Sequence, residues 1–170
     1  MKSQGQGRTW RFGDNINTDL IQPGHALLGD VTQEGRYVFE ANRPGWVQEM
    51  SPGDVVVGGK NFGTGSSRPA ARALVRAGVG ALIADSINSL FFRNCVNYGL
   101  PALQFPGASD MFAEGDRASF DIETGEVRNL TRGEVVIAEP WPEDLLRIFR
   151  AGGLIALLTQ EDLVFAEEEL

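Results

Sequence analysis

The chain has 170 residues, long enough for one domain with a substantial core, and its 42% hydrophobic and 22% charged residues are ordinary for a globular protein. Its formal net charge of −8 argues against nucleic acid or an anionic membrane as the main partner, so an anionic ligand must be attracted by a local positive site. No apolar run in the sequence approaches the length of a membrane span and no charged-then-apolar leader opens it, so we expect a cytoplasmic protein.

The first fifty residues are mostly irregular. Residues 8–13 predict a short first strand, and a polar, turn-rich stretch follows it. Residues 21–50 then scatter apolar side chains among prolines and glycines, and long loops inside compact domains are usually functional. We interpret this segment, residues 21–50, as a lid or specificity loop. The alternative is a series of short helices that the sequence pattern does not reveal.

The middle of the chain alternates strand and helix patterns. Apolar runs that suit strands buried on both faces are separated by helical patterns that end at glycines. The predicted order is a strand at 54–58, a helix that starts at Pro69 and ends at Gly78, a strand at 79–84, a helix capped by Asp85-Ser86 and ended by Gly99, and a strand at 100–105. This β-α-β-α-β order predicts a parallel sheet with right-handed crossovers.

The last third changes character. Two Gly-Glu-Val repeats, at 125–127 and 133–135, mark consecutive hairpins with strands at 118–122, 127–130 and 135–138. We then expect a helix after Pro142, a closing strand at 154–158, and an acidic, solvated tail at about 166–170. The predicted fold is a single α/β domain over 1–170, in which a parallel β-α-β-α-β sheet is combined with antiparallel hairpins.

Metal ligands are scarce in the sequence. Cys95 is the one cysteine, which excludes an internal disulfide, and His25 is the one histidine. One residue of each kind cannot complete a zinc site or hold an iron–sulfur cluster unaided. We therefore predict no metal site on this chain, and any metal that the protein uses must come mostly from another chain. Cys95 falls on the apolar stripe of a predicted helix and is interpreted as a core residue.

The segment that carries the most chemistry is the glycine-rich loop at residues 58–68, between a predicted strand and a predicted helix. Its four glycines allow sharp turns and a close approach of the backbone to a ligand. Two serines and Arg68 follow where the helix begins, and free N–H groups beside a guanidinium form an anion site that suits a carboxylate as well as a phosphate. A serine in this field can act as a base because its alkoxide is stabilised. The alternatives are a helix-capping serine and an arginine in a surface ion pair.

Several motifs resemble one known family. The Gly-Asp-x-x-x-Thr-Asp-x-Ile pattern of residues 13–21 and the Gly-Lys-Asn-Phe-Gly-x-Gly-Ser-Ser-Arg pattern of residues 59–68 are similar to those of the aconitase swivel domain. Segments at 85–87, 92–94 and 125–130 also look like that family. In size and order of motifs, the chain resembles the small subunits of 3-isopropylmalate dehydratases (isopropylmalate isomerases) and homoaconitases, over roughly residues 8–158.

This resemblance implies a division of labour between two chains. A large subunit would carry a [4Fe–4S] cluster that acts as Lewis acid on a substrate hydroxyl, in a heterodimer or heterotetramer, and the small subunit would close over the substrate. The implied reaction isomerises 2-isopropylmalate to 3-isopropylmalate by dehydration and rehydration, in leucine biosynthesis. The substrate class is a small hydroxy-dicarboxylate, and the implied protein binds neither nucleic acid nor a membrane.

The resemblance also assigns site residues. Ser66 would be the base that removes a proton beside a carboxylate, and Arg68 would bind a substrate carboxylate. Further substrate-binding positions would be Ser67, Gly63, Gly65 and Asn61. The specificity loop would lie at Gly24, His25, Ala26 and Leu27.

Two departures from the family pattern leave the substrate open. The pattern commonly continues Glu-His after the arginine, whereas Pro69-Ala70 stands here, and a proline restricts the backbone of the residue before it. The loop at 22–28 also differs from the usual Ile-Pro-x-x-Tyr-Leu, with Ala26 at the tyrosine-like position. The alternatives are therefore a paralogous subunit for a homoaconitate, citramalate or dimethylmalate type of substrate, or a carboxylate-binding module without catalysis.

Overall fold

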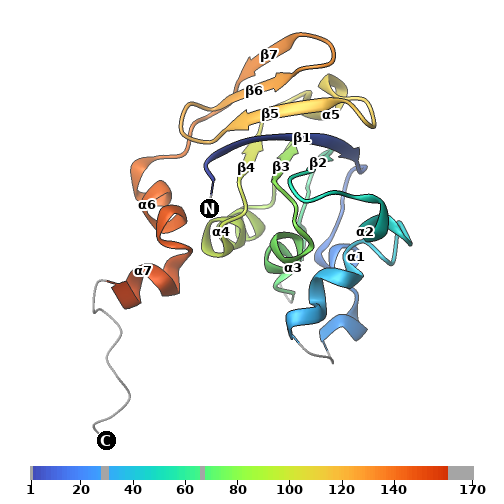
Figure 1. The fold of residues 1–170 in the computed structure, drawn as a ribbon, viewed down its shortest axis with the longest axis vertical. Coiled ribbons are helices and arrows are strands. Elements are labelled where there is room, and N and C mark those ends of the chain that lie inside the picture. The colour runs from blue at the N-terminus through green and yellow to red at the C-terminus, as the bar shows by residue number, and fades with distance from the viewer. Residues whose placement is uncertain (1, 28–30, 66–67, 161–170) are drawn as a thin grey trace, which may run out of the picture.

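The computed structural model describes residues 2–27, 31–65 and 68–160, and its centre is a seven-stranded mixed sheet (Figure 1). The strand order is β4-β3-β2-β1-β5-β6-β7. The strands are β1 (Gln4–Arg11), β2 (Val55–Gly58), β3 (Ala81–Ala84), β4 (Ala102–Gln104), β5 (Arg117–Asp121), β6 (Glu126–Asn129) and β7 (Glu134–Ile137). The mixed α/β fold predicted from the sequence is confirmed.

The parallel half of the sheet consists of β1 to β4, which lie in chain order from one strand to the next. Every residue of β2 and β3 is buried, as the uninterrupted apolar runs predict for strands covered on both faces. Because successive right-handed crossovers here all advance in one direction, their helices lie on the same face of the sheet. Figure 1 shows α3 (Ala70–Ala77) and α4 (Ser89–Tyr98) side by side on that face.

Strand β1 joins the parallel half to the antiparallel half. Its residues Gln4–Arg8 pair with β5 in antiparallel register, and its last residues, Thr9 to Arg11, pair with β2 in parallel register. The predicted hairpins then add β6 and β7 beyond β5, with Phe120 opposite Val127 and Val127 opposite Val136. One long strand therefore holds both sheet types in a single core.

Three helices end at glycines in the left-handed conformation, as is common when the residue after a helix can adopt φ > 0. Helix α3 ends at Gly78 (φ +98°), α4 at Gly99 (φ +72°) and α6 (Glu143–Ala151) at Gly152 (φ +98°). The other elements are α1 (Thr18–Ile21), the 3₁₀ helices η1 (Gly24–Leu27) and η2 (Val31–Tyr37), α2 (Trp46–Glu49), α5 (Ala108–Met111) and α7 (Leu154–Gln160).

Two local predictions are wrong. Residues 154–158, expected as a closing strand, lie in the helix α7, which packs beside α6. Its short apolar run cannot distinguish the two structures by periodicity. Helix α4 is capped by Asn88, whose side chain accepts from the Leu90 N–H, and not by Asp85-Ser86. Asp85 instead accepts hydrogen bonds from the backbone N–H and hydroxyl of Ser109, both at 2.8 Å.

The segment at 21–50 contains α2 and the two 3₁₀ helices, which is the alternative that the sequence left open. Phe39 and Trp46 are buried there, and their rings are 5.0 Å apart in an edge-to-face arrangement. Phe39 also stacks on Phe12, which follows β1, with ring centroids 3.9 Å apart. Phe39 and Trp46 therefore anchor this segment in the hydrophobic core. The acidic tail predicted at 166–170 lies outside the described residues.

Candidate functional site

Three loops meet where the parallel strands end. They follow β1, β2 and β3, and parallel strands bring their carboxyl ends to one edge of the sheet, which is where open α/β sheets bind ligands. Backbone hydrogen bonds join the loops: Gly63 donates to Ile16 at 2.7 Å, Thr18 to Thr64 at 2.8 Å, and Phe62 to Ser86 at 3.0 Å. The sequence predicted the loops separately, and the sheet brings them together.

Two glycines in the β2 loop are required by neighbouring side chains. A Cβ at Gly59 would lie 2.0 Å from Asp14 Oδ1, and the same carboxylate oxygen accepts the Lys60 N–H at 2.7 Å. Gly63 has φ +81°, and a Cβ there would lie 2.1 Å from Cγ of Phe91. At these two positions, the close approach that glycine permits is to other parts of the same chain. The glycines thus hold the loop in position for its later residues.

Arg68 lies between the loop after β1 and the 3₁₀ helix η1. Its Nε donates to Asp19 Oδ1 at 2.7 Å, and its side chain is 21% exposed. The two terminal nitrogens face the backbone of Gly24, 3.5 and 3.6 Å from where a Cβ would stand. Pro69 occupies the cap of α3 and gives the helix no side-chain hydrogen bond. Arg68 is therefore a half-buried guanidinium oriented by one carboxylate.

The other predicted substrate-binding positions have different surroundings. Asn61 is exposed and has φ +56°, and its amide nitrogen donates to Asn15 Oδ1 at 3.1 Å. Gly65 is exposed with φ +86°, and a Cβ there would lie 2.9 Å from the hydroxyl of Thr18. Gly63 is buried against Phe91, as described above. The predicted base Ser66 and its neighbour Ser67 lie outside the described residues.

The predicted specificity residues at 24–27 form the 3₁₀ helix η1, and they differ in exposure. His25 is exposed, and its Nε2 lies 2.8 Å from Glu40 Oε2, while its ring meets the edge of Tyr37 at 5.2 Å. Ala26 is buried, and its N–H donates to the Pro23 carbonyl at 3.0 Å. Gly24 faces Arg68, whose terminal nitrogens would meet a side chain at that position. The structure thus brings one end of the predicted specificity loop to the predicted carboxylate-binding residue.

Asp19 and Glu34 are two acidic residues to which the sequence analysis assigned no role. Asp19 belongs to the Gly-Asp-x-x-x-Thr-Asp-x-Ile pattern of residues 13–21, but only the fold shows that it pairs with Arg68. Glu34 is 2% exposed and binds Arg72 and Arg76, which stand four residues apart on α3. That spacing places two arginines on one helix face and was the available signal of a buried anion opposite them. The hydrogen bond from Arg72 to Glu34 raises the pKa of Arg72, against the opposing effect of burial.

Metal ligands are not gathered in the described parts of the chain. Over residues 2–27, 31–65 and 68–160, no group of three or more His, Cys, Asp or Glu is arranged to hold a metal ion. Cys95 is fully buried on α4, and burial raises the pKa of its thiol far above the ordinary value. A protonated thiol in the core cannot ligate a cluster at the site, so these residues do not fit an iron–sulfur cluster. Within the same ranges, no helix has the length and apolarity needed to span a membrane.

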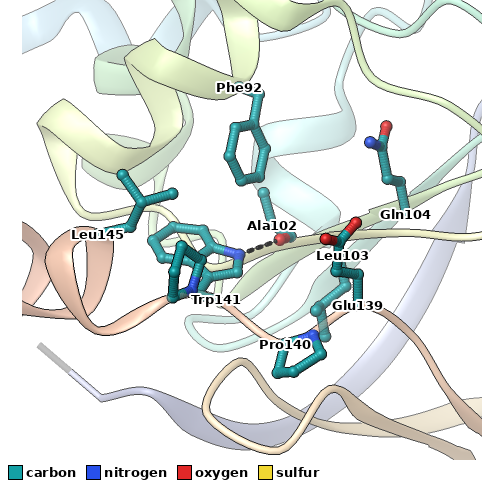
Figure 2. A pocket seen from close by; sticks show the side chains of 9 residues that line it. Phe92, Ala102, Leu103, Gln104, Glu139, Pro140, Trp141 and Leu145 are labelled. Atoms are coloured by element: carbon teal, nitrogen blue, oxygen red, sulfur yellow. Dashed lines mark hydrogen bonds between the residues drawn. The ribbon is translucent and has the colours of Figure 1, made fainter.

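A pocket lies beside the start of α6, and its lining residue Gln104 accepts a hydrogen bond from the Ile87 N–H in the loop after β3 at 2.7 Å. Figure 2 shows Trp141 at its centre, with its ring nitrogen donating to the Ala102 carbonyl at 2.7 Å. Trp141 also packs edge-to-face on Phe92 and on Phe149 of α6. The pocket measures about 220 Å³ and is lined by Phe92, Ala102, Leu103, Gln104, Glu139, Pro140, Trp141, Pro142 and Leu145. Trp141, like Trp10 and Trp46, is buried in the core.

Comparison with known proteins gives the family. The profile of the aconitase C-terminal domain matches residues 14–108, which include all three loops. The chain belongs to the aconitase C-terminal domain family. The small subunit of isopropylmalate/citramalate isomerase from Methanocaldococcus jannaschii is 41% identical over 163 residues, covering 95% of this chain and 97% of that protein. The small subunit of methanogen homoaconitase from Methanothermobacter thermautotrophicus is 42% identical, covering 88% of each.

A solved crystal structure has the same fold. The crystal structure of 3-isopropylmalate dehydratase from Methanocaldococcus jannaschii has a TM-score of 0.86 and 31% identity, covering 94% of this chain and 96% of that one. Within the family, the chain therefore belongs with the small subunits of isopropylmalate isomerases and homoaconitases, and the resemblance seen in the sequence is confirmed. Homologues named for different substrates match it about equally well, so identity alone does not select a substrate.

Proposed function

We propose that this chain is the small subunit of a heteromeric iron–sulfur hydro-lyase that isomerises 2-isopropylmalate to 3-isopropylmalate by dehydration and rehydration. The observation that carries the proposal is the placement of Arg68, whose guanidinium is oriented by Asp19 and faces η1 at the carboxyl edge of the parallel strands. The identity to dehydratase and isomerase small subunits supports the reaction class.

In this proposal Arg68 binds a carboxylate of the substrate. Its Nε is engaged by Asp19, so the two terminal nitrogens can form the parallel pair of hydrogen bonds that carboxylates accept. The pair is strengthened by partial burial of the arginine side chain, because burial reduces competition from water. The hydroxy-diacid would then have one carboxylate fixed between the β2 loop and η1.

Ser66 is proposed as the base. It stands two residues before Arg68 in the sequence, and the glycine loop that precedes it is held by contacts to Asp14 and Phe91. A serine can remove a weakly acidic proton only if its anion is stabilised, and nearby N–H groups and a guanidinium stabilise such an anion. In the reverse step the serine returns the proton to the carbon. Ser67 would bind the substrate or orient Ser66.

The cluster is assigned to a large subunit in this proposal. The described residues of this chain do not fit an iron–sulfur cluster. The contribution of this chain is limited to carboxylate binding, proton transfer and the shape of the pocket. We therefore expect the chain to be inactive alone and active after assembly.

A second substrate class is favoured by the η1 segment. Ala26, at the tyrosine-like position, is buried, and His25 beside it is paired with Glu40, so η1 differs from the usual family pattern. A paralogous subunit for homoaconitate, citramalate or dimethylmalate would have such a difference, and homologues named for homoaconitase and citramalate are among its relatives.

The test is reconstitution. The chain is co-expressed with the large subunit from its own organism, and the assembled enzyme is assayed on isopropylmalate, citramalate, dimethylmalate and homoaconitate. We expect turnover of isopropylmalate by the assembly and none by either subunit alone. Preference for another diacid would select the second class, and carboxylate binding without turnover by an intact assembly would indicate a non-catalytic module.

Ser66→Ala tests the base. Loss of a positioned general base lowers the rate by roughly 10²- to 10⁴-fold, and we expect that loss with assembly unchanged by size-exclusion chromatography. Ser89→Ala, at an exposed serine on α4, is the matched control and should retain full activity. Turnover by Ser66→Ala at the rate of this control would remove Ser66 as the base.

A further inference from the structure

Glu34 is a buried carboxylate that the proposed chemistry does not use. Its side chain is 2% exposed, and among the described residues it accepts hydrogen bonds from two arginines and a glutamine. Arg72 donates to both of its oxygens, from Nε at 2.7 Å and from the terminal nitrogen at 3.1 Å. Arg76 donates at 2.8 Å and Gln22 at 3.1 Å. We call these four residues, Gln22, Glu34, Arg72 and Arg76, the Glu34 clasp.

The clasp joins the two ends of the segment that contains η1. Gln22 comes directly after α1 and two residues before Gly24, and Glu34 lies in η2 on the far side of η1. The hydrogen bond between Gln22 and Glu34 therefore closes the base of this segment. The two arginines fasten that base to α3, because both stand on its side facing η2.

The predicted carboxylate-binding residue lies just before the same helix. Arg68 stands two residues before Ala70, the first residue of α3, and its guanidinium faces the backbone of Gly24. Hydrogen bonds therefore connect Gln22 through Glu34 and Arg72 to α3, and the guanidinium of Arg68, two residues before α3, faces the backbone of Gly24, two residues after Gln22. A displacement of the Glu34 side chain would change the position of η1 relative to Arg68.

Such an arrangement is costly unless it is complete. Removing a carboxylate from water is unfavourable, and its pairing with two cations offsets that only when the hydrogen bonds are well formed. Replacing the carboxylate by an amide would put an N–H₂ group opposite donors from Arg72 and Gln22. Each oxygen of Glu34 thus accepts two hydrogen bonds, whereas Gln22 Oε1 is buried without a partner among the described residues. The four hydrogen bonds to the carboxylate define the position of the two segments that the clasp joins.

We infer that Glu34 is a positioning residue that sets the distance between Arg68 and η1, and through it the choice of substrate. This inference rests on the proposed function for the role of Arg68, and it extends that proposal to a residue outside the pocket. Under this inference, Glu34 does not contact the substrate. It acts by holding η1 against the guanidinium that binds the carboxylate.

The test is Glu34→Gln in the assembled enzyme, with kcat and KM measured separately for isopropylmalate and citramalate. We expect the ratio of kcat/KM for isopropylmalate to kcat/KM for citramalate to fall about tenfold, because KM for isopropylmalate rises. A misplacement of about 1 Å can lower a reaction rate by up to roughly a hundredfold. The control is Asp116→Asn, because Asp116 is also a buried carboxylate but its hydrogen bonds go to Ala113 and Asn129. It should lower thermal stability without changing the ratio.

Arg72→Lys covers the case in which Glu34→Gln does not fold. Lysine keeps the charge but loses the two-pronged contact, so a smaller change of the ratio in the same direction is expected. An unchanged ratio in whichever of the two variants folds overturns the inference. The same holds if Asp116→Asn shifts the ratio as much as they do, because the effect would then follow from stability alone.

A second readout separates this inference from the proposed function. Amide hydrogen exchange, measured on the assembly, should rise together in residues 24–27 and 68–72 of Glu34→Gln, and should rise only near 113–132 in Asp116→Asn. An assembly that turns over none of the diacids would overturn the proposed function and leave this readout to decide the clasp. Coupled exchange supports the clasp, and unchanged exchange at 24–27 overturns it.

Discussion

Asp19 and Arg68 are 49 residues apart in the chain and are joined by a 2.7 Å hydrogen bond between carboxylate and Nε. Asp19 lies in the short helix α1, which follows β1, and Arg68 lies in the loop that follows β2. Because this hydrogen bond is donated by Nε, it fixes the orientation of the guanidinium and leaves the two terminal nitrogens for other partners. The pair shows how the sheet, and not local sequence, assembles the candidate anion site.

Arg68→Lys should weaken substrate binding. A lysine keeps the charge but cannot bind Asp19 and a substrate carboxylate with one planar group. A hydrogen bond to a charged group contributes about 1.5–3 kcal/mol, so we expect KM to rise roughly tenfold to a hundredfold. Steady-state kinetics of the assembled enzyme measure this directly.

Arg128→Lys is the matched control for that variant. Arg128 also makes a two-pronged contact, with Glu126 on β6, but it belongs to the antiparallel half of the sheet. This variant should keep the wild-type KM. If the two lysine variants show equal KM values, Arg68 does not bind the substrate.

Gly63→Ala should be among the most destabilising substitutions in the β2 loop. Its backbone has φ +81°, which disfavours any side chain, and the new Cβ would lie 2.1 Å from the Phe91 ring. The left-handed conformation alone costs about 1–2 kcal/mol, and displacing a buried ring adds about 1–3 kcal/mol. Gly133→Ala, with φ +75° and nothing within 4 Å of its Cβ, isolates the backbone contribution.

Chemical denaturation of the two alanine variants gives the comparison. We expect Gly133→Ala to lose about 1 kcal/mol of unfolding free energy and Gly63→Ala to lose clearly more. The difference measures the contact with Phe91. Equal losses would show that Phe91 moves aside at no cost, and the loop would then not be held by this contact.

The fold could be predicted from the sequence wherever a pattern was local and long enough. The buried runs at 54–58 and 79–84 and the Gly-Glu-Val repeats gave the correct strands, because strand periodicity and turn residues act over few positions. The apolar run at 154–158 was too short to separate helix from strand, and α7 is a helix. The cap of α4 was misassigned because Asp85 and Asn88 are both good caps, and Asp85 is bound to Ser109.

The candidate site was predictable only in part. The glycine loop and Arg68 stood out because their residue types are themselves chemical signals. Asp19 and Glu34 did not, because an isolated acidic residue in a polar stretch has the same appearance whether it is solvated or bound to an arginine far along the chain. The pairing depends on crossovers and on the position of η2 against α3, which no local pattern encodes.

The acid stability of the protein should depend on Asp116. Burial opposes its ionisation, but hydrogen bonds from Ala113 and Asn129 and the charge of Arg132 outweigh this and lower the pKa of Asp116. A group whose pKa is lower in the folded state stabilises the fold above its unfolded pKa, about 3.9, and this stabilisation is lost as the pH falls through the folded pKa. The melting temperature of Asp116→Asn should therefore lie below that of the wild type at pH 7.

The gap between these two melting temperatures should narrow as the pH falls below about 4, because Asp116 is then protonated first in the unfolded wild-type chain and, at lower pH, in the folded one. Calorimetry from pH 7 to pH 3 measures the gap. Glu123→Gln serves as a comparison, because its carboxylate is more exposed and pairs with Arg150 at the surface. A gap for Asp116→Asn that stays constant with pH would show that the variant acts through packing alone.

Cys95 should be unreactive in the folded protein. Its side chain is fully buried on α4, and burial raises the pKa of the thiol, so neither access nor ionisation favours alkylation. We expect iodoacetamide at pH 8 to label the native chain only as fast as the protein opens, and to label it at once in denaturant. Gly63→Ala should increase the native labelling rate, because Phe91 precedes Cys95 by one turn of the same helix. Rapid labelling of the wild-type protein would place the thiol near the surface and contradict the packing of α4 against the sheet.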